Sequence, residues 1–316
     1  MKPISRRSFT KKTALALSAI PFVSVAENFI TPQKPYNKLN VNIFSKHLQF
    51  LNFKELGEKT VEMGFNGVDL TVRPNGHVLP EQVFDVLPKA VYDIKRSGAN
   101  CIMMTTAVNS IDNQTDVNVL KAASENSIRY YRSNWFKYSK EKPMEACLMD
   151  YQKDIKNLST FNKKLGLVGC YQNHAGTNVG SSIWEIKKIL ELANLESFGA
   201  QYDIRHAVVE GGLSWPNGIK LIKDNIKTIV LKDFKWGQIN GVWKPVNVPI
   251  GEGMVDFISY FKLLKKYNIN VPVSLHCEYD LGGAERGSKN PSLDKKEIYK
   301  SISKDLKTIN TLWEMA

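Results

Sequence analysis

The sequence of 316 residues has few cysteines and no glycine-rich nucleotide-binding fingerprint. Its four cysteines, at positions 101, 147, 170 and 277, show no Cys-x-x-Cys spacing, which argues against a zinc ribbon and against a disulfide scaffold. Cys170 and Cys277 fall on predicted strands, so we expect them to be buried free thiols. No Gly-x-Gly-x-x-Gly follows the first predicted strand, which argues against a dinucleotide-binding sheet.

The chain also lacks a long uncharged apolar segment and a linker rich in Pro, Gly and Ser. The apolar stretch at residues 13–25 is too short to span a bilayer comfortably, so we expect no stable membrane anchor. It follows Arg6 and Arg7 and is followed by small residues up to Ala26, a pattern typical of a twin-arginine export signal. We predict a signal over residues 1–26 and a periplasmic or otherwise exported mature chain. A basic amphipathic leader without an export function is the alternative.

The excess of basic side chains is modest once this leader is set apart. The whole chain has a formal charge of +12, and its first 26 residues hold five basic side chains and no acidic one, which leaves 12 − 5 = +7. The remaining lysines are spread over helical patterns such as residues 262–266 and 295–300. This distribution favours solvated helix faces over a stripe that binds nucleic acid, so we expect no nucleic-acid partner.

A regular alternation of strand and helix patterns runs through the rest of the chain. The predicted strands cover residues 39–44, 67–72, 100–106, 128–132, 167–171, 199–203, 228–232 and 271–276. The predicted helices cover residues 53–63, 81–96, 117–126, 144–164, 183–193, 219–224, 255–266 and 295–313. Eight such units without a break predict one α/β domain over residues 37–316, a (β/α)₈ TIM barrel. A doubly wound open sheet is the structural alternative, because it uses the same alternation.

Polar side chains gather where the predicted strands end. Each histidine lies at the carboxyl end of a predicted strand or in the loop beyond it; the five are His47, His77, His174, His206 and His276. In a (β/α)₈ barrel these strand ends meet at the face that carries the active site. One such residue alone could be a hydrogen-bonded structural histidine, but the five together predict a site at that face.

Two carboxylates end strands at the same predicted face. Asp203 ends the sixth strand, and Glu278 lies two residues beyond His276, on the same side of the chain by the period-two alternation of a strand. With the side-chain carbonyl of Gln172, these oxygens are candidates to hold a hard divalent cation. Asp203 could instead cap a helix or pair with Arg205.

Six segments, taken in order, resemble the xylose isomerase-like TIM barrels, the superfamily of sugar isomerases, epimerases and endonuclease-IV-like enzymes. They are residues 64–70 (Gly-Phe-Asn-Gly-Val-Asp-Leu), 171–174 (Tyr-Gln-Asn-His), 203–206 (Asp-Ile-Arg-His), 231–233 (Leu-Lys-Asp), 251–257 (Gly-Glu-Gly-Met-Val-Asp-Phe) and 276–279 (His-Cys-Glu-Tyr). The resemblance covers essentially all of the mature sequence. An endonuclease is disfavoured, because that branch needs a richer set of histidine and acidic ligands.

In the sugar epimerases of that superfamily, the resemblance implies a divalent metal held by Glu, Asp, His and Glu from strands five to eight, with the two Glu as acid and base. The Asp corresponds to Asp203, the last Glu to Glu278, and a sugar-contacting histidine to His206. Gln172 and Val230 depart from the strand-five Glu and the strand-seven His. We therefore expect a weakened site for Mn²⁺, Co²⁺, Mg²⁺ or Zn²⁺ on Gln172, Asp203 and Glu278. Epimerisation with two opposed bases is impaired, because an amide takes no proton.

The catalytic candidates are Glu278, His174 or His276 as the base, and Lys232 as a source of positive charge. Lys232 is the inward neighbour of Val230. It either stabilises an enolate-like intermediate, beside or in place of a metal ion, or simply pairs with Asp203 or Glu278.

Further polar and aromatic side chains suit a polyhydroxylated substrate. The substrate-binding candidates are Arg73, His77, Arg132, Asn173 and His206, and the candidates for stacking on a sugar face are Trp135, Trp215 and Trp236, each of which could instead pack in a loop. Arg73 and Arg132 could also bind phosphate. The predicted export favours a free sugar or a glycoside, because phosphosugars are rare outside the cytoplasm.

The leading hypothesis is a carbohydrate isomerase or epimerase that abstracts a proton next to a carbonyl. A lyase or hydratase on 3-keto-sugars or 3-keto-glycosides comes second, because one general base and one acid suffice for it and the loss of the strand-five Glu counts less. A non-catalytic sugar-binding barrel comes third, on account of the two substitutions at Gln172 and Val230. The oligomeric state is left open.

Overall fold

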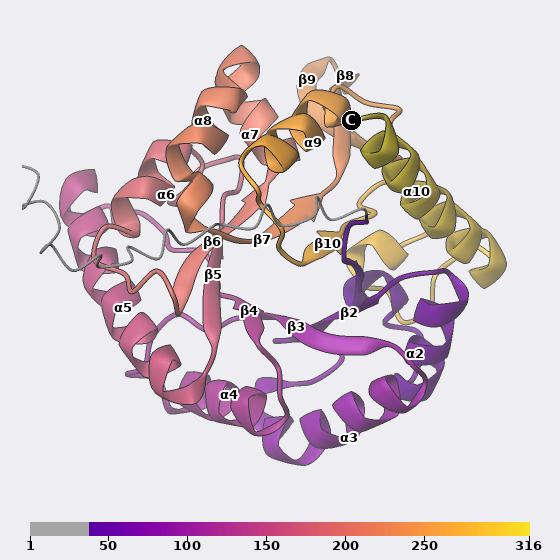
Figure 1. Cartoon of the computed structure of the whole chain (residues 1–316), viewed down its shortest axis with the longest axis horizontal. Coiled ribbons are helices and arrows are strands. Elements are labelled where there is room, and N and C mark those ends of the chain that lie inside the picture. The colour runs from indigo at the N-terminus through magenta and orange to yellow at the C-terminus, as the bar shows by residue number, and fades with distance from the viewer. Residues whose placement is uncertain (1–37) are drawn as a thin grey trace, which may run out of the picture. The chain divides into compact units, whose positions relative to one another are not determined.

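A computed structural model describes residues 38–316, and its strands close into a parallel barrel (Figure 1). The barrel strands are β1 (Val41–Phe44), β2 (Gly67–Val72), β3 (Asn100–Thr106), β4 (Tyr130–Arg132), β5 (Val168–Gln172), β6 (Phe198–Asp203), β7 (Ile226–Leu231) and β10 (Val273–Leu275). Ring order is β1-β10-β7-β6-β5-β4-β3-β2, so the first and last strands are neighbours. This closure confirms the TIM barrel and excludes the open sheet. The predicted export signal at residues 1–26 lies outside the described residues.

Helices surround the barrel on its outer side (Figure 1). The α-helices are α2 (Phe53–Glu62), α3 (Val83–Arg96), α4 (Gln114–Glu125), α5 (Met144–Leu165), α6 (Ile183–Ile189), α7 (Ile204–Gly211), α8 (Trp215–Ile222), α9 (Phe257–Lys266) and α10 (Lys295–Met315). Short 3₁₀ turns are η2 (Ser45–Leu48), η3 (Pro80–Gln82), η4 (Gly212–Ser214), η5 (Lys223–Asn225) and η6 (Ala284–Arg286). Among the described residues, no helix combines the length and the apolar character needed to cross a membrane.

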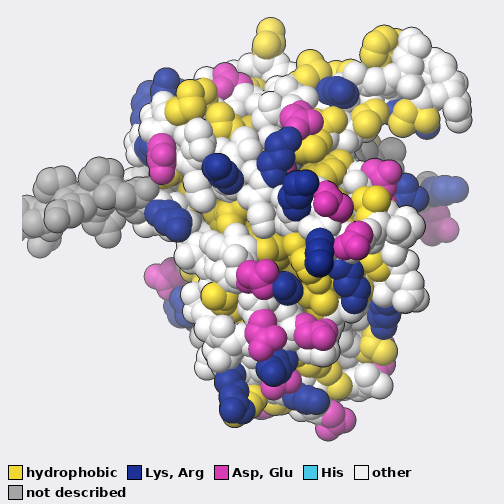
Figure 2. Space-filling view, turned by 90° about the vertical axis from the view of Figure 1, so that its right-hand side faces the viewer, with side chains coloured by type: hydrophobic (Ala, Val, Ile, Leu, Met, Phe, Trp, Pro, Cys, Tyr) yellow, Lys and Arg dark blue, Asp and Glu magenta, His cyan; other side chains and the backbone are white. Residues whose placement is uncertain are grey.

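The core lies between the barrel and this ring of helices. In α3, the apolar residues Leu87, Val91 and Ile94 recur at helical spacing and are buried, while Tyr92 is exposed. Burying one such leucine contributes about 2 kcal/mol to folding. All four cysteines are buried and unpaired, as expected for Cys170 and Cys277. On the face shown in Figure 2, basic side chains are interspersed with acidic and uncharged ones, as expected for solvated helices.

Helix α7 is the main departure from the predicted elements. The sequence pattern predicted a single helix at residues 219–224 between the sixth and seventh strands, but α7 begins directly after β6 and α8 follows it. The Asp203 carboxylate causes this early start, because it accepts a 3.1 Å hydrogen bond from the backbone N–H of His206 and so caps the helix. His206 therefore lies on a helix, and the expectation that every histidine lies outside helices is wrong for this residue.

A β-hairpin inserted after β7 was not predicted. Its strands β8 (Asp233–Ile239) and β9 (Val242–Val248) pair antiparallel outside the barrel. Asn240 and Gly241 form the turn with φ of 52° and 76°, the backbone that a tight two-residue hairpin requires. The Asn-Gly pair was the sequence signal for this hairpin.

Asp233 ties the end of the seventh barrel strand to the segment that precedes α9. Its carboxylate accepts hydrogen bonds from the backbone N–H groups of Phe234 (2.8 Å), Gly251 (3.0 Å), Gly253 (3.0 Å) and Val255 (3.2 Å). A Cβ at Gly253 would lie 2.2 Å from Asp233 Oδ1, so only glycine fits there. The Leu-Lys-Asp and Gly-Glu-Gly segments therefore occur together for a structural reason.

Candidate functional site

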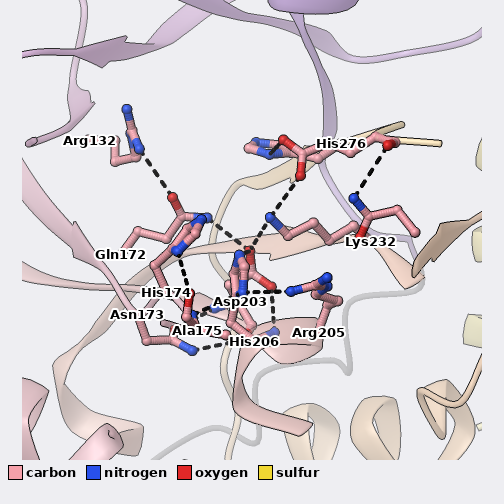
Figure 3. A network of polar contacts seen from close by, with 12 residues as sticks. Arg132, Gln172, Asn173, His174, Ala175, Asp203, Arg205, His206, Lys232 and His276 are labelled. Atoms are coloured by element: carbon pink, nitrogen blue, oxygen red, sulfur yellow. Dashed lines mark hydrogen bonds and ion pairs between the residues drawn. The ribbon is translucent and has the colours of Figure 1, made fainter. Parts of the chain in front are cut away.

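Many of the predicted site residues lie together at the carboxyl ends of the barrel strands, among them Gln172, Asp203 and Lys232 (Figure 3). Gln172 ends β5, Asp203 ends β6, Lys232 directly follows β7, and Glu278 lies in the loop after β10. These four side chains are joined in one chain of polar contacts. The geometric expectation that residues distant in sequence meet at one opening is thus met.

Lys232 lies at the centre of this network. Its Nζ atom is 3.2 Å from Asp203 Oδ2 and 3.2 Å from Glu278 Oε2. A second lysine, Lys46, approaches the other oxygen of Glu278, with Nζ 2.7 Å from Oε1. Lys232 thus pairs with both acids that the sequence offered as alternatives.

The orientation of the Gln172 amide follows from its neighbours. Its Nε2 atom donates a 2.8 Å hydrogen bond to Asp203 Oδ2, and its Oε1 atom accepts a 3.3 Å hydrogen bond from Arg132. Because an ionised carboxylate only accepts and a guanidinium only donates, the reverse orientation would lose both bonds. The carbonyl that was expected to face a metal therefore faces Arg132.

A cavity of about 100 Å³ opens beside these residues. Its walls include most of the predicted catalytic and substrate-binding side chains; they are Phe44, Lys46, Arg73, Arg132, Trp135, Gln172, His174, Lys232, His276 and Glu278. The Arg132 guanidinium lies 4.1 Å from the centre of the Trp135 ring, and His174 meets the same ring edge-on at 4.7 Å. A wider groove of about 600 Å³ shares Lys46 and Glu278 with this cavity.

Three of the predicted substrate-binding residues do not line the cavity. His77 Nδ1 lies 3.2 Å from Thr71 Oγ1 and 3.1 Å from Ser45 Oγ, in the loop after β2. Asn173 Nδ2 donates to the backbone carbonyl of Asp203, and its Oδ1 accepts from the backbone N–H of the same residue. These contacts hold His77 and Asn173 outside the walls of this cavity, and sugar binding by either residue stays a prediction.

His206 is the third of these residues. Its Nδ1 accepts a 3.1 Å hydrogen bond from the backbone N–H of Ala175, and its ring packs against His174 with centroids 4.0 Å apart. It thus supports the loop that carries His174, and a direct sugar contact through its Nε2 atom stays a prediction.

His276 presents the clearest unused hydrogen-bonding groups. Its ring stacks on Phe44 with centroids 4.1 Å apart and an interplanar angle of 15°. Both ring nitrogens are buried, and neither has a hydrogen-bond partner among the described residues. Since a buried imidazole without partners is costly, a substrate oxygen in the cavity is a natural partner.

The local charges set the protonation of the possible bases. Burial alone would raise the pKa of Glu278, but Lys232 and Lys46 outweigh it and hold that pKa well below its usual range. Burial, reinforced by Lys232, lowers the pKa of His174 to about 4 and the pKa of His276 well below its ordinary value. At neutral pH the site therefore offers an ionised carboxylate and uncharged imidazoles.

Burial shifts the pKa values of Arg132 and Asp203 in the directions that favour their uncharged forms. Burial, followed by repulsion from Arg73, lowers the pKa of Arg132 to about 9, so the group stays cationic at neutral pH. Burial raises the pKa of Asp203, and attraction to Lys232 partly offsets this effect. Asp203 is completely buried, and its carboxylate contacts two residues of the cavity wall, Gln172 and Lys232.

The donor set does not fit a divalent metal. Of the three predicted ligands, Gln172 turns an NH₂ group toward Asp203, and both carboxylates already hold the Lys232 ammonium. Val230, at the position where the resemblance implies a histidine, is a buried hydrocarbon. Within residues 38–316, no group of three or more His, Cys, Asp or Glu is arranged to hold a metal ion.

Sequence reasoning missed Phe44 and Lys46. Phe44 is the last residue of β1, and Lys46 lies two positions beyond it. The available signal was their place after the first strand, at the same face as the other candidates. Trp135 lines the cavity as one of the predicted stacking candidates, whereas Trp215 meets Tyr260 edge-on at 6.1 Å and Trp236 lies on β8.

Comparison with solved structures returns proteins of the same architecture. D-psicose 3-epimerase with D-tagatose, from Clostridium cellulolyticum H10, aligns at a TM-score of 0.66 and 12% identity, over 87% of this chain and 100% of its own. A probable 3-DHS dehydratase involved in petrobactin synthesis, from Bacillus anthracis, aligns at 0.62 and 12%, over 85% and 99%. A xylose isomerase-like TIM barrel protein from Mycobacterium smegmatis, in complex with magnesium, aligns at 0.60 and 10%, over 85% and 98%.

At such low identity these likenesses show the fold alone. No curated protein matches the chain in sequence. The model of the xylose isomerase-like TIM barrel, however, matches residues 58–296, which include the ends of β2 to β10 and every residue of the cavity wall except Phe44 and Lys46. The closed barrel and this match together show that the chain belongs to the xylose isomerase-like TIM barrel family.

Proposed function

We propose that this barrel is an enzyme of the sugar isomerase and epimerase kind that removes a proton from the carbon next to a carbonyl group. The observation that carries the proposal is the shared cavity, in which the ionised Glu278 faces the same space as Lys232, Arg132 and His276, whose ring nitrogens have no hydrogen-bond partner among the described residues. The likeness to a sugar epimerase and to a dehydratase supports an enzyme that acts on a carbonyl compound.

In the proposed step, Glu278 takes the α-proton of the bound sugar. The electron pair of the broken C–H bond moves toward the carbonyl oxygen, which becomes an enolate oxygen. Lys232 and Arg132 stabilise its negative charge, and His276 orients the substrate through its free ring nitrogens. Return of the proton by Glu278 to the neighbouring carbon, with the hydroxyl proton passing to the former carbonyl oxygen, gives the isomer. An epimer forms only when a proton reaches the original carbon from the opposite face. His174, also in the cavity wall, is the alternative base.

The single ionised carboxylate in the cavity wall favours chemistry on one face of the substrate. Gln172 cannot exchange a proton, so the pair of opposed bases that serves a symmetric epimerisation is missing. Elimination from a 3-keto-sugar or 3-keto-glycoside needs only one base and is the second candidate. In that reaction the substituent next to the carbanion leaves with its bonding electrons and takes up a proton from a general acid or water, and no proton returns to the carbon. The wider groove beyond Glu278 has room for the departing group of a glycoside.

The proposed substrate is a free sugar or glycoside met outside the cytoplasm, consistent with the predicted export signal. Arg73 and Arg132 in the cavity wall would hold oxygens of the substrate. The aromatic ring of Trp135 supplies a face for stacking.

Deuterium uptake tests the proposal. Purified protein is incubated in D₂O with aldo-hexoses, keto-hexoses and 3-keto-glucosides, and the sugars are analysed by NMR and mass spectrometry. We expect deuterium at a carbon next to a carbonyl, and a loss of about 10² to 10⁴ in its rate for Glu278→Gln. Glu252→Gln, which changes an exposed carboxylate paired with Lys304, is the matched control and keeps the rate.

Three results would change this assignment. No deuterium in any of the sugars, with sugar binding detected by calorimetry, would favour a non-catalytic sugar-binding barrel. Release of the aglycone from a 3-keto-glycoside would favour the lyase. A Glu278→Gln variant as fast as the unaltered enzyme would exclude Glu278 as the base.

A further inference from the structure

The Lys232 ammonium occupies the point between two carboxylates where a bound cation would lie. Its Nζ atom is 3.2 Å from an oxygen of Asp203 and 3.2 Å from an oxygen of Glu278, and its side chain is 3% exposed. Carboxylate oxygens that share a divalent ion lie about 2.0–2.6 Å from it. The ammonium and a metal ion therefore cannot fill this space at the same time.

The charges around this point already balance. Asp203 and Glu278 supply two negative charges, and Lys232 and Lys46 supply two positive ones, each within 3.2 Å of a carboxylate oxygen. A divalent ion would add two positive charges beside both ammonium groups in a largely buried site, where charges interact strongly. Electrostatic repulsion thus opposes a metal ion in the site as it is built.

The neutral neighbours do not compensate for this repulsion. Gln172 offers its NH₂ group to Asp203, and its carbonyl is engaged by Arg132. Val230 is fully buried and carries no donor atom. Gln172 and Val230, the two departures from the family pattern, thus remove metal ligands from the site into which Lys232 brings its positive charge.

From this arrangement we propose that Lys232 is the resident cation of the site and that the chain holds no divalent metal there. The ammonium keeps the two carboxylates together in the resting site. It also lines the cavity, where its N–H groups can face a substrate oxygen that becomes negatively charged. In this role the lysine acts through its charge and its N–H groups and exchanges no proton with the substrate. Only this last, catalytic part rests on the proposed function.

Metal binding by the full-length protein tests the proposal directly. The chain as purified is analysed for metal by mass spectrometry, then treated with chelator and titrated by calorimetry with MnCl₂, CoCl₂, MgCl₂ and ZnCl₂. We expect no saturable binding that depends on Asp203. One equivalent of metal that is bound by the unaltered chain and lost in Asp203→Asn would overturn the proposal. Binding that survives Asp203→Asn lies elsewhere and is consistent with it.

A designed gain of metal binding gives a second test. Lys232→Met combined with Gln172→Glu removes the ammonium and adds a third carboxylate, so this double variant should bind one Mn²⁺ at least about 100-fold more tightly than the unaltered chain. Lys46→Met combined with Gln172→Glu is the matched control, because it also removes one lysine from Glu278 but keeps Lys232 between the two acids. Equal Mn²⁺ affinity of the two double variants would contradict the proposal.

The double variant need not fold without metal for the test to be decisive. Three buried carboxylates repel one another, so recovery of a cooperative thermal transition on adding MnCl₂ is an equivalent positive result. If the variant stays unfolded with every metal, the titration of the unaltered chain decides alone.

Turnover separates this inference from the proposed reaction. Deuterium exchange that persists after chelator treatment supports both. Exchange that returns only when Mn²⁺ is added back would overturn the role of Lys232 and leave the reaction standing. Absence of both exchange and metal binding would remove the reaction but still agree with a site closed to metal by the lysine.

Discussion

The side-chain amide of Gln172 donates a 2.8 Å hydrogen bond to the carboxylate of Asp203, and both side chains are almost completely buried. The amide N–H and the Lys232 ammonium both favour the ionised form of this carboxylate, against the burial that raises its pKa. A glutamate in the same place would put two acids in contact. The pair thus explains in physical terms why the departure at position 172 and the lysine at position 232 go together.

Gln172→Glu should make stability depend on pH. Two carboxyl groups this close in a buried site cannot both ionise, so one of them keeps a proton and its pKa rises in the folded state. A raised folded pKa means that stability is lost as the pH rises above the unfolded value of about 4.3. We expect the variant to be less stable than the unaltered chain by about 2 to 3 kcal/mol at pH 8. Urea unfolding at pH 8 and pH 5 should show this deficit shrinking in acid.

Gln172→Met is the control for that experiment. It removes both hydrogen bonds without adding a charge, and it should cost about 1 to 3 kcal/mol at either pH. A deficit of Gln172→Glu that is the same at both pH values would contradict the contact with Asp203.

The buried histidines should make the protein sensitive to mild acid. Burial lowers the pKa of His47 to about 3 and the pKa values of His77 and His174 to about 4, whereas an unfolded histidine titrates near 6.5. Below pH 6.5 the unfolded state therefore binds more protons, and stability falls as the pH falls. Each such histidine should contribute a loss of about 1 kcal/mol between pH 7 and pH 5.5.

His47→Gln isolates one of these contributions. His47 Nε2 accepts a 3.0 Å hydrogen bond from the backbone N–H of Cys277, and a glutamine carbonyl can replace that acceptor without titrating. The difference in unfolding free energy between pH 7 and pH 5.5 should shrink by about 1 kcal/mol in this variant. An unchanged difference would mean that His47 is not held neutral in the folded state.

Trp135 should matter for substrate binding through Arg132. The ring supports the guanidinium at 4.1 Å, and its Nε1 donates a 3.1 Å hydrogen bond to the backbone carbonyl of Gln172. Trp135→Ala should weaken sugar binding about tenfold, because a stacked cation of this kind is worth about 1 to 2 kcal/mol. Trp135→Phe keeps a ring and should lose less. Calorimetry with a sugar identified by deuterium exchange measures both, and Trp184→Ala on the exposed face of α6 should change nothing.

We expect the Asp233 side chain to contribute to the stability of the fold. Its carboxylate accepts four backbone hydrogen bonds, of which an asparagine can replace about half, so Asp233→Asn should cost about 2 to 4 kcal/mol. Asp280→Asn, at an exposed aspartate that accepts one backbone hydrogen bond, should cost less than about 1 kcal/mol. Urea unfolding compares the two variants, and equal losses would show that the Asp233 contacts add little.

The barrel could be predicted because each of its elements follows a local rule. Periods of 2 and 3.6 mark strands and helices, and β2 and β3 have the predicted bounds, Gly67–Val72 and Asn100–Thr106. Helix α7 was not predicted, because its start depends on the Asp203 side chain. Strands β8 and β9 were not predicted, because the Asn240-Gly241 turn was overlooked. These misses shift elements without changing the order of the barrel strands.

The sequence by itself determined the ring of strands and the face on which polar residues collect. Each strand and helix is marked by the hydrophobic periodicity of its own segment, and eight such units in order give the barrel and its carboxyl-end face. Only the tertiary structure decided which of those residues meet. Lys46 and Glu278 are separated by 232 positions, and their contact depends on closure between β1 and β10. Asn173 and His206 were close in sequence to the right strand ends, yet stronger backbone partners hold them outside the cavity. Side-chain direction at a strand end is set by competition among partners from several strands, and no local pattern records that competition.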